Sequence, residues 1–540
     1  MNTTAPERAG RREWTGLAVL VLPTLLVSMD LTVLHLAVPV LSADLRPTGT
    51  QLLWITDIYG FLIAGWLITM GALGDRIGRR RLLLTGGAAF GAASVLAAMS
   101  DSAEMLIATR GLLGVAGATL MPSTLSLIRH MFQDPAQRTF AVSTWMTTFM
   151  VGGAIGPLVG GALLEKFWWG SVFLLGVPVM LLLLVLGPAL LPEYRAPGAG
   201  RLDVVSVLLS LVSVLTAVYG VKRLAEHGAD WAAGAAVLTG LAVGAVFLRR
   251  QRMLRDPLID LRLFSERTFS AALSTQTLGV FAMAGTQFFI IQYLQLVEGL
   301  SPLQAGLWTL PSTAAGIVGA MLAPAVVRKV RPAYAMGAGL LLAALGFVAM
   351  TRVAGDSGLA VLVAGFVVTS FGLGPTMTLT TDMIIGSAPP ERAGAASAIS
   401  ETGSEFGLAM GLAVIGSAGT AVYRAEAADA VPGGVPADAA EAARDTLGGA
   451  VDVAGGLPAG LAARLLDGAR EAFTSALHTT AALSCAVTLA LVVLVMTLLR
   501  RTPAGAGPQE HGEASEKNHD DSDDVPGRRE ESVPEKRDTI

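Results

Sequence analysis

Repeated apolar stretches of membrane-spanning length constrain the possible folds of this chain more than any other feature. Windows of about 20 residues detect about fourteen such stretches, each able to cross a hydrocarbon core of about 30 Å as a helix. Only 15% of the 540 residues are charged, against about 25% in soluble proteins. Because so little polar material cannot cover a soluble surface, we predict an all-α integral membrane protein in contact with the lipid bilayer.

The predicted spans fall into two long series with a pair between them. They lie near residues 15–40, 51–74, 82–101, 103–128, 139–164 and 170–191, then 203–222 and 231–249, then 268–294, 303–327, 333–352, 357–386, 394–420 and 476–499. Residues 421–475 are too polar to span and read as an outer loop with short helical runs near 439–447 and 461–469. The charged segment 501–540 is typical of a disordered tail.

Arginine and lysine in the short loops predict the orientation. They gather in four segments, 76–81, 129–138, 249–267 and 328–331, whereas the opposite loops hold few, such as Arg46, Lys166 and Arg352. Positive charge favours the cytoplasmic side. An even number of spans returns residues 1–14 and 501–540 to that side, so we expect a multi-pass protein of the cell membrane with both termini cytoplasmic.

Several classes of function are disfavoured by the sequence. The single cysteine, Cys485, excludes an intrachain disulfide and gives no support for a zinc cluster. No Gly-x-x-x-x-Gly-Lys-Ser/Thr loop for a nucleotide occurs. The net charge of -4 offers no basic surface for nucleic acid. No pairing of nucleophile and base indicates an enzyme, and we expect neither a metal nor a cofactor.

Residues 152–161, GGAIGPLVGG, place five glycines and a proline inside an apolar stretch. Glycine removes the side chains that keep helices apart, and proline interrupts the helical hydrogen bonds. The segment therefore predicts a close helix contact and a bend, and we expect a hinge at Gly152, Gly156, Pro157, Gly160 and Gly161.

Ionisable residues inside the spans are candidates for function, because a charge near the bilayer centre costs about 2.5 to 3.5 kcal/mol on insertion scales. Asp30 lies close to the middle of the first span, Asp57 lies further out in the second, and Arg110 enters the fourth from its outer end. A carboxylate that is alternately buried and exposed near a movable arginine can bind and release a proton. The alternative is a static Asp30–Arg110 ion pair that fixes helix register.

Further ionisable residues belong to later spans. Glu401 and Glu405 are four residues apart and so share one helical face, where a cation between them would relieve their repulsion. The alternative is polar contact with neighbouring serine and threonine. Asp382, near the cytoplasmic end of its span, is expected to reach interfacial water. His35 is either a proton relay near Asp30 or, more commonly for a lone histidine, a packed residue.

The loop after the second span, 71–81, combines glycine, aspartate and arginine. Gly71 permits close helix contact, Asp75 can cap a helix or pair with an arginine, and the arginines fix the loop to the cytoplasmic face. The matching loop of the second half, 327–332, keeps basic residues but has no aspartate. A conformational latch would therefore be asymmetric or belong to one half only.

Aromatic side chains could line a substrate pocket by attracting cations to their ring faces. The candidates in the first half are Trp54, Tyr59, Trp145 and Phe149. Most aromatic residues in such spans instead face lipid or the protein core.

Five segments, in order, resemble the signatures of one family: 29–39 (MDLTVLHLAVP), 53–59 (LWITDIY), 71–81 (GALGDRIGRRR), 106–114 (LIATRGLLG) and 152–161. They are similar to the fourteen-span drug:proton antiporters of the major facilitator superfamily, particularly exporters of quaternary ammonium compounds. The resemblance implies two six-helix bundles, 15–191 and 268–499, with two inserted helices at 203–249.

The resemblance also implies roles for the candidate residues. Asp30, Arg110 and Asp57 would couple transport to protons; Glu401, Glu405, Asp57 and the aromatic residues would recognise the cation; Gly71, Asp75, Arg76, Gly78 and Arg79 would form the latch. No carboxylate occurs in 310–317 of the tenth span, where some members carry one, which favours monovalent over divalent cations. We therefore expect proton-driven efflux of lipophilic cations by a monomer. A dedicated exporter or importer of one metabolite, and a non-transporting receptor, are the alternatives.

Overall fold

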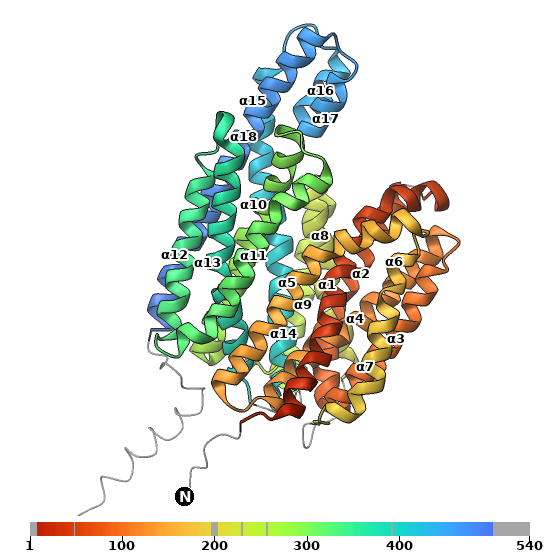
Figure 1. Cartoon of the computed structure of the whole chain (residues 1–540), viewed down its shortest axis with the longest axis vertical. Helices are drawn as coiled ribbons and strands as arrows, with labels where there is room; N and C mark the ends of the chain where they lie inside the picture. Colours follow the sequence, from red (N-terminus) through yellow and green to blue (C-terminus); the bar gives the residue numbers. More distant parts are fainter. Residues whose placement is uncertain are drawn as a thin grey trace, which may run out of the picture. The chain divides into compact units, whose positions relative to one another are not determined.

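The computed structural model describes residues 8–47, 49–195, 203–227, 231–254, 257–389 and 392–500. Within them, 14 helices are long and apolar enough to cross a membrane. The predicted all-α membrane architecture is confirmed, and the chain is a multi-pass membrane protein (Figure 1). The expected tail, 501–540, lies outside the described residues.

The first bundle, called the N-bundle (residues 11–190), holds six spans. Its helices are α1 (Arg11–Leu45), α2 (Gly49–Ile77), α3 (Arg79–Ala98), α4 (Ala103–Met131), α5 (Pro135–Lys166), and α6 (Ser171–Leu174) with α7 (Gly176–Leu190), the last two sharing one span. Several begin at residues that suit a helix start. Ser102 caps α4 through the N–H of Met105, and Asp134 caps α5 just before Pro135.

Two helices, α8 (Val204–His227) and α9 (Trp231–Met253), form the inserted hairpin. Glycine brings them together, since a Cβ at Gly240 would lie 2.7 Å from the backbone nitrogen of Ala217. At its base, Arg250 donates from Nε to Asp203 Oδ2 at 2.7 Å and from Nη2 to Oδ1 at 3.1 Å. These hydrogen bonds hold the pKa of the Asp203 carboxyl well below its usual value.

The second bundle, called the C-bundle (residues 261–498), holds the remaining spans. Its elements are η1 (Leu261–Ser265), α10 (Arg267–Gln292), η2 (Tyr293–Val297), α11 (Pro302–Val327), α12 (Pro332–Met350), η3 (Gly355–Ser357), α13 (Gly358–Ser387), α14 (Ala393–Gly411), η5 (Leu412–Gly416), α15 (Ser417–Ala430), α16 (Ala437–Asp445), α17 (Leu447–Ala454) and α18 (Ala459–Leu498). A capping box at Ser301 starts α11.

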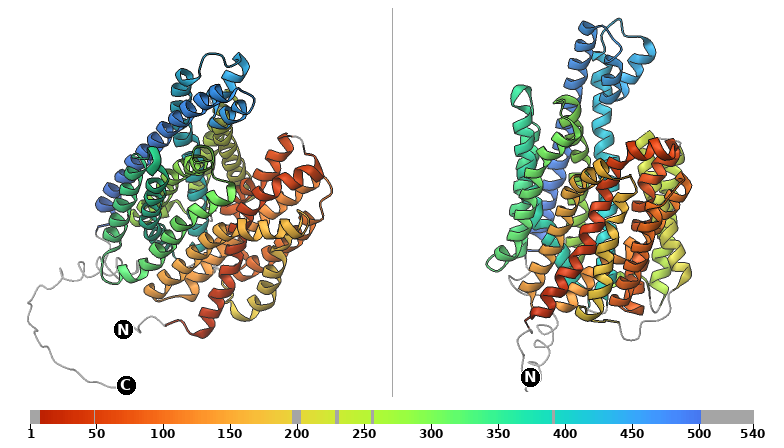
Figure 2. Two further views of the ribbon diagram at one scale, coloured as in Figure 1. Left: turned by 45° about the horizontal axis from the view of Figure 1, so that its top comes forward. Right: turned by 45° about the vertical axis from the view of Figure 1, so that its right-hand side comes forward.

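The segment 421–475 differs from the expected outer loop. Helix α15 continues the span of α14, and α18 has 40 residues, about 60 Å at about 1.5 Å per residue and twice the hydrocarbon thickness. Figures 1 and 2 show these helices, with α16 and α17, projecting at one end. Small alanine and glycine side chains allow the four helices to pack, and Tyr423 donates to the carbonyl of Ala443 at 2.8 Å. The run at 461–469 is thus part of α18.

Candidate functional site

A buried ion pair joins the first and fourth spans. Arg110 of α4 donates from Nη1 to Oδ2 of Asp30, in α1, at 2.6 Å. Arg110 Nε donates to the backbone carbonyl of Ile55, in α2, at 3.3 Å. The Arg110 side chain is 2% exposed and that of Asp30 is 14% exposed. The guanidinium is therefore held among three helices, and the carboxylate is the member of the pair that keeps an exposed surface.

The ring of Tyr59, in α2, lies against this guanidinium. Arg110 Cζ is 4.5 Å from the ring centroid, within the range of a cation–π contact. Tyr59 is fully buried, and its hydroxyl has no hydrogen-bond partner among the described residues. Asp30, Arg110 and Glu405 all lie close enough to act on that hydroxyl electrostatically. The structure thus brings predicted residues of both bundles into one site.

Glu401 and Glu405 lie on one face of α14, both half-buried, and their charges interact. A neighbouring face of α14 is tied to α10 by Gln276, whose Nε2 donates to Ser400 Oγ at 2.9 Å and to Ser404 Oγ at 2.8 Å. The two serines expected as polar partners of the glutamates are thus bonded to Gln276. This network fixes the helix that presents both carboxylates.

Three predicted residues have side chains outside the described part of the structure. The structure describes only the backbones of these residues: His35 is in α1, Asp57 in α2 and Pro157 in α5.

The predicted aromatic residues occupy different surroundings. Trp145 is 2% exposed in the N-bundle core, and its Nε1 donates to Thr124 Oγ1 at 3.1 Å. Phe149 is half-buried and stacks on Trp145 with ring centroids 6.3 Å apart. Trp54, by contrast, is 43% exposed. In this conformation Trp145 is a packing residue, and Trp54 and Phe149 keep surface for a ligand.

Three glycines of the 152–161 segment face α1 on either side of Asp30. They are Gly152, Gly156 and Gly160, spaced by four residues along α5. A Cβ on each would collide in turn with the Leu25 carbonyl oxygen at 2.5 Å, with Thr32 Oγ1, and with Val33 Cγ1 at 2.8 Å. A Cβ at Gly161 would meet nothing within 4 Å. The glycine face therefore sets the distance between α5 and the helix that carries Asp30.

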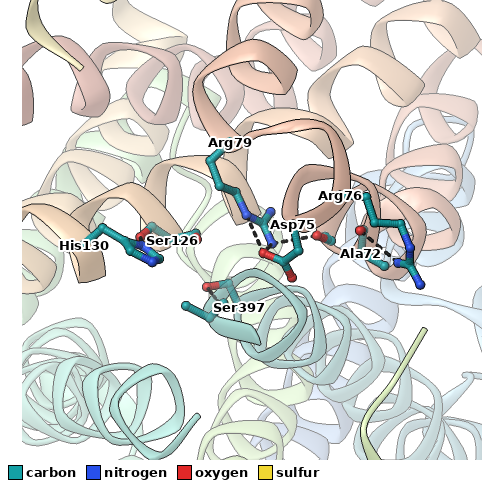
Figure 3. Close-up of polar contacts among 9 residues, drawn as sticks. Ala72, Asp75, Arg76, Arg79, Ser126, His130 and Ser397 are labelled. Carbon is teal, nitrogen blue, oxygen red and sulfur yellow. Dashed lines mark hydrogen bonds and ion pairs between the residues drawn. The ribbon is translucent and has the colours of Figure 1, made fainter. Parts of the chain in front are cut away.

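The end of α2 and the start of α3 contact the first turns of α14 (Figure 3). Arg79 Nε donates to Asp75 Oδ1 at 2.9 Å, and Arg79 Nη2 donates to the carbonyl of Gly71 at 2.6 Å. The carboxylate of Asp75 also lies near the backbone N–H of Ala395 in the first turn of α14, which acts on it electrostatically. The α14 N-cap residue, Arg392, provides no side-chain cap. Asp75 therefore pairs with an arginine of its own bundle and faces the N-terminus of a helix of the other, whose dipole favours a negative charge.

Glycines make room for this contact. A Cβ at Gly394 would overlap the Arg79 guanidinium, and one at Gly71 would lie 2.5 Å from a side chain of α14. Gly78 connects α2 to α3 at φ 112°, a conformation that favours glycine. Arg76 turns back toward its own helix and donates to a carbonyl of α2 at 3.0 Å. Of the predicted latch residues, Gly71, Asp75 and Arg79 therefore face α14, whereas Arg76 bonds within α2.

Asp382 corrects an expectation. It does not reach interfacial water but is 7% exposed, with both carboxylate oxygens bonded to α5 of the opposite bundle. Arg138 Nε donates to Oδ1 at 2.6 Å, and Thr139 Oγ1 donates to Oδ2 at 2.7 Å. The physical reason is that helices of the two bundles meet here, and a carboxylate buried between them needs charged or hydrogen-bonding partners.

The sequence does not single out Arg138 and Gln276, although both bond to helices distant in sequence. Arg138 reads as one more basic residue of the arginine-rich side, and Gln276 as an unremarked polar residue of the ninth span. A polar residue inside an apolar span signals that a polar partner lies nearby. Asp382 gives this signal for its partner Arg138, and Gln276 gives it for itself. Only the packing of helices distant in sequence shows which groups these residues meet.

Comparison with known proteins identifies relatives. The model of the Major Facilitator Superfamily matches residues 20–412. The chain is 44% identical to the multidrug efflux pump LfrA of Mycolicibacterium smegmatis, over 92% of this chain and 99% of LfrA. It is 36% identical to the methyl viologen resistance protein SmvA of Salmonella typhimurium, over 86% of this chain and 93% of SmvA.

Two further similarities concern a more distant export protein and a solved structure. The tetracenomycin C resistance and export protein of Streptomyces glaucescens is 31% identical, over 92% of this chain and 94% of its own length. The crystal structure of the human organic anion transporter MFSD10 (TETRAN) aligns with a TM-score of 0.57 over 89% of this chain and 99% of that chain. At 16% identity it shows a shared fold.

Proposed function

The chain belongs to the major facilitator superfamily, among its fourteen-span drug exporters, and we propose that it exports lipophilic, mainly monovalent cations in exchange for protons. It is a transporter rather than an enzyme. The observation that carries the proposal is the buried Asp30–Arg110 pair, at 2.6 Å, beside the glycine face of α5. Relatives named for multidrug efflux and for resistance to methyl viologen, an organic dication, support export of organic cations, whereas the preference for monovalent ones rests on the lack of a carboxylate in 310–317.

The geometry of the Asp30–Arg110 pair supports its proposed role as the proton site. In the proposed cycle a proton takes the place of Arg110 beside Asp30 when the arginine moves away, and it leaves when the ion pair forms again. Tyr59 offers the guanidinium a ring face that needs no carboxylate. Exchange of a proton for a cation requires that Asp30 can be protonated. Arg110 can stay buried against the Tyr59 ring while this happens.

The polar contacts at one end support an alternating-access cycle. We define the arginine-rich end as the end that carries the α2–α3 and α4–α5 connections, and we assign it, with both termini, to the cytoplasm. There Asp75 and Arg79 contact α14, and Asp382 contacts α5. The described conformation is then closed toward the cytoplasm, and proton uptake at Asp30 precedes its return to the inward-facing state.

Recognition of the cation is assigned to the face of α14 that carries Glu401 and Glu405, with Phe149 and Trp54 as aromatic surfaces. A cation near this face is attracted both by the carboxylates and by ring quadrupoles. Since one chain contains both bundles and the candidate site, a monomer is sufficient. The relative named for tetracenomycin C favours a second candidate, a dedicated exporter of a single product.

The test is dissipation of a pH gradient in proteoliposomes on addition of tetraphenylphosphonium, ethidium or methyl viologen. The parent protein should dissipate the gradient with the monovalent cations, and Asp30→Asn should not, while remaining folded. Asp452→Asn, which removes an exposed carboxylate of α17, is the matched control and should behave like the parent. Unchanged coupling in Asp30→Asn would refute the proton site. Activity with one compound alone would favour the dedicated exporter.

A further inference from the structure

Asp382 gives the C-bundle an acidic contact of its own with the N-bundle. Because the loop 327–332 lacks an aspartate, the sequence predicts a latch that is asymmetric or belongs to one half only. We propose that Asp382, Arg138 and Thr139 form a second latch, whose hydrogen bonds hold the bundles together at the arginine-rich end and break when that end opens. The proposal rests on the alternating-access cycle proposed above and assigns positioning residues to it.

The contact is buried and uses both carboxylate oxygens. The side chains of Arg138 and Asp382 are 6% and 10% exposed. Thr139 has one hydroxyl proton, and Asp382 Oδ2 at 2.7 Å competes for it with the carbonyl of Pro135 at 2.9 Å, so the hydroxyl can turn back to its own helix when Asp382 leaves. A carboxylate so placed is satisfied only while α5 and α13 are together, because α5 supplies both of these hydrogen-bond donors. Separation of the helices must replace them with water.

A second arginine of the N-bundle also lies near Asp382, whose negative charge offsets the repulsion between the two arginines. Arg129, near the end of α4, is 8% exposed and acts electrostatically on both Arg138 and Asp382. Its Nε has no hydrogen-bond partner among the described residues. Two cations of the N-bundle thus face one carboxylate of the C-bundle. An amide in place of that carboxylate would leave two buried arginines to repel each other.

The two latches involve different helices. The contact of Asp75 and Arg79 joins the end of α2 and the start of α3 to α14, whereas the Asp382 contact joins α13 to α5. Loss of either one leaves the other helix pair in contact. The bundles can therefore separate fully at this end only when both contacts have broken, and each residue set can be tested by itself.

The experiment measures opening directly by thiol labelling. Ser397 of α14 is fully buried and lies beside Asp75 (Figure 3), so Ser397→Cys reports exposure of the interface at a distance from Asp382. The only native cysteine, Cys485, is removed as Cys485→Ser. In inside-out vesicles without substrate or pH gradient, Asp382→Asn should increase the rate of labelling by a membrane-impermeant maleimide about tenfold or more, because it breaks a buried pair.

Three further variants make the result specific. Exchange of charges, Arg138→Asp with Asp382→Arg, should restore slower labelling than Asp382→Asn. Thr139→Val, which removes one hydrogen bond, should give a smaller increase and decides the question if Asp382→Asn does not fold. Asp203→Asn removes a carboxylate paired within the inserted hairpin and should label like the parent.

Labelling of folded Asp382→Asn at the parental rate, or equal acceleration by Asp203→Asn, would overturn the latch. Because the assay needs neither drug nor proton gradient, failure of drug export would leave this result standing. Loss of the latch effect would in turn leave the Asp30 experiment unaffected.

Discussion

Replacement of Gly152 by alanine tests whether the glycine face of α5 positions the proposed proton site. A Cβ there would lie 2.5 Å from the carbonyl oxygen of Leu25 and 3.0 Å from Cβ of Ser28, whereas ordinary contact begins at 3.4 Å. A backbone oxygen cannot rotate away as a side chain can. Helix α1 must therefore move from α5 by about 1 Å to restore van der Waals contact.

The magnitude follows from two opposing effects. Overpacking of a tight contact costs about 1–3 kcal/mol, and alanine gains about 0.5–1 kcal/mol over glycine within a helix. Because the obstruction is backbone, we expect the upper part of the first range and a net loss of about 2 kcal/mol in stability. The displaced helix carries Asp30, whose Oδ2 lies 2.6 Å from Arg110. Coupling should therefore fall together with stability.

Gly161→Ala is the matched control, because it lies in the same helix and its Cβ would meet nothing within 4 Å. We expect Gly152→Ala to lower the midpoint of thermal unfolding in detergent and to impair efflux of ethidium. Gly161→Ala should match or slightly exceed the stability of the parent and should transport normally. Equal stability and equal efflux in the two variants would refute the account of the glycine face.

Three other predictions concern single contacts. Trp145→Phe removes the hydrogen bond to Thr124 and should lower stability by about 1 kcal/mol with little change in the apparent KM for ethidium; a large change in KM would place the ring in the pocket. Gln276→Leu leaves two serine hydroxyls of α14 without their partner and should cost about 1–3 kcal/mol, measured by thermal unfolding, and an unchanged midpoint would contradict the network. Asp203→Asn should be less stable than the parent at neutral pH. Since Arg250 lowers the pKa of Asp203 in the folded state, its contribution is present above the ordinary carboxyl pKa and disappears as pH falls through the lowered value, so the two midpoints should converge only in strong acid.

The fold class and the main pair of the site could be predicted because they depend on local properties. A span needs about 20 apolar residues in sequence, and Asp30 and Arg110 stand out because charges are rare in such segments. The glycines of 152–161 likewise signal close packing wherever their helix lies. None of these inferences requires knowing which helices are neighbours.

Only the tertiary structure shows which partners the buried polar and charged side chains have. Asp382 and Arg138 are 244 residues apart, and no sequence periodicity relates them; they meet because α5 and α13 pack together. The same holds for Gln276 with the serines of α14, and for the burial of Trp145 in the N-bundle core. For 421–475 the sequence predicts an outer loop with only short helical runs, because alanine-rich and polar segments carry little hydrophobic signal. The small side chains nevertheless allow α15, α16, α17 and α18 to pack together. The composition of the sequence determined which segments are buried in the membrane. The packing of helices distant in sequence determined which partner each buried polar or charged side chain has.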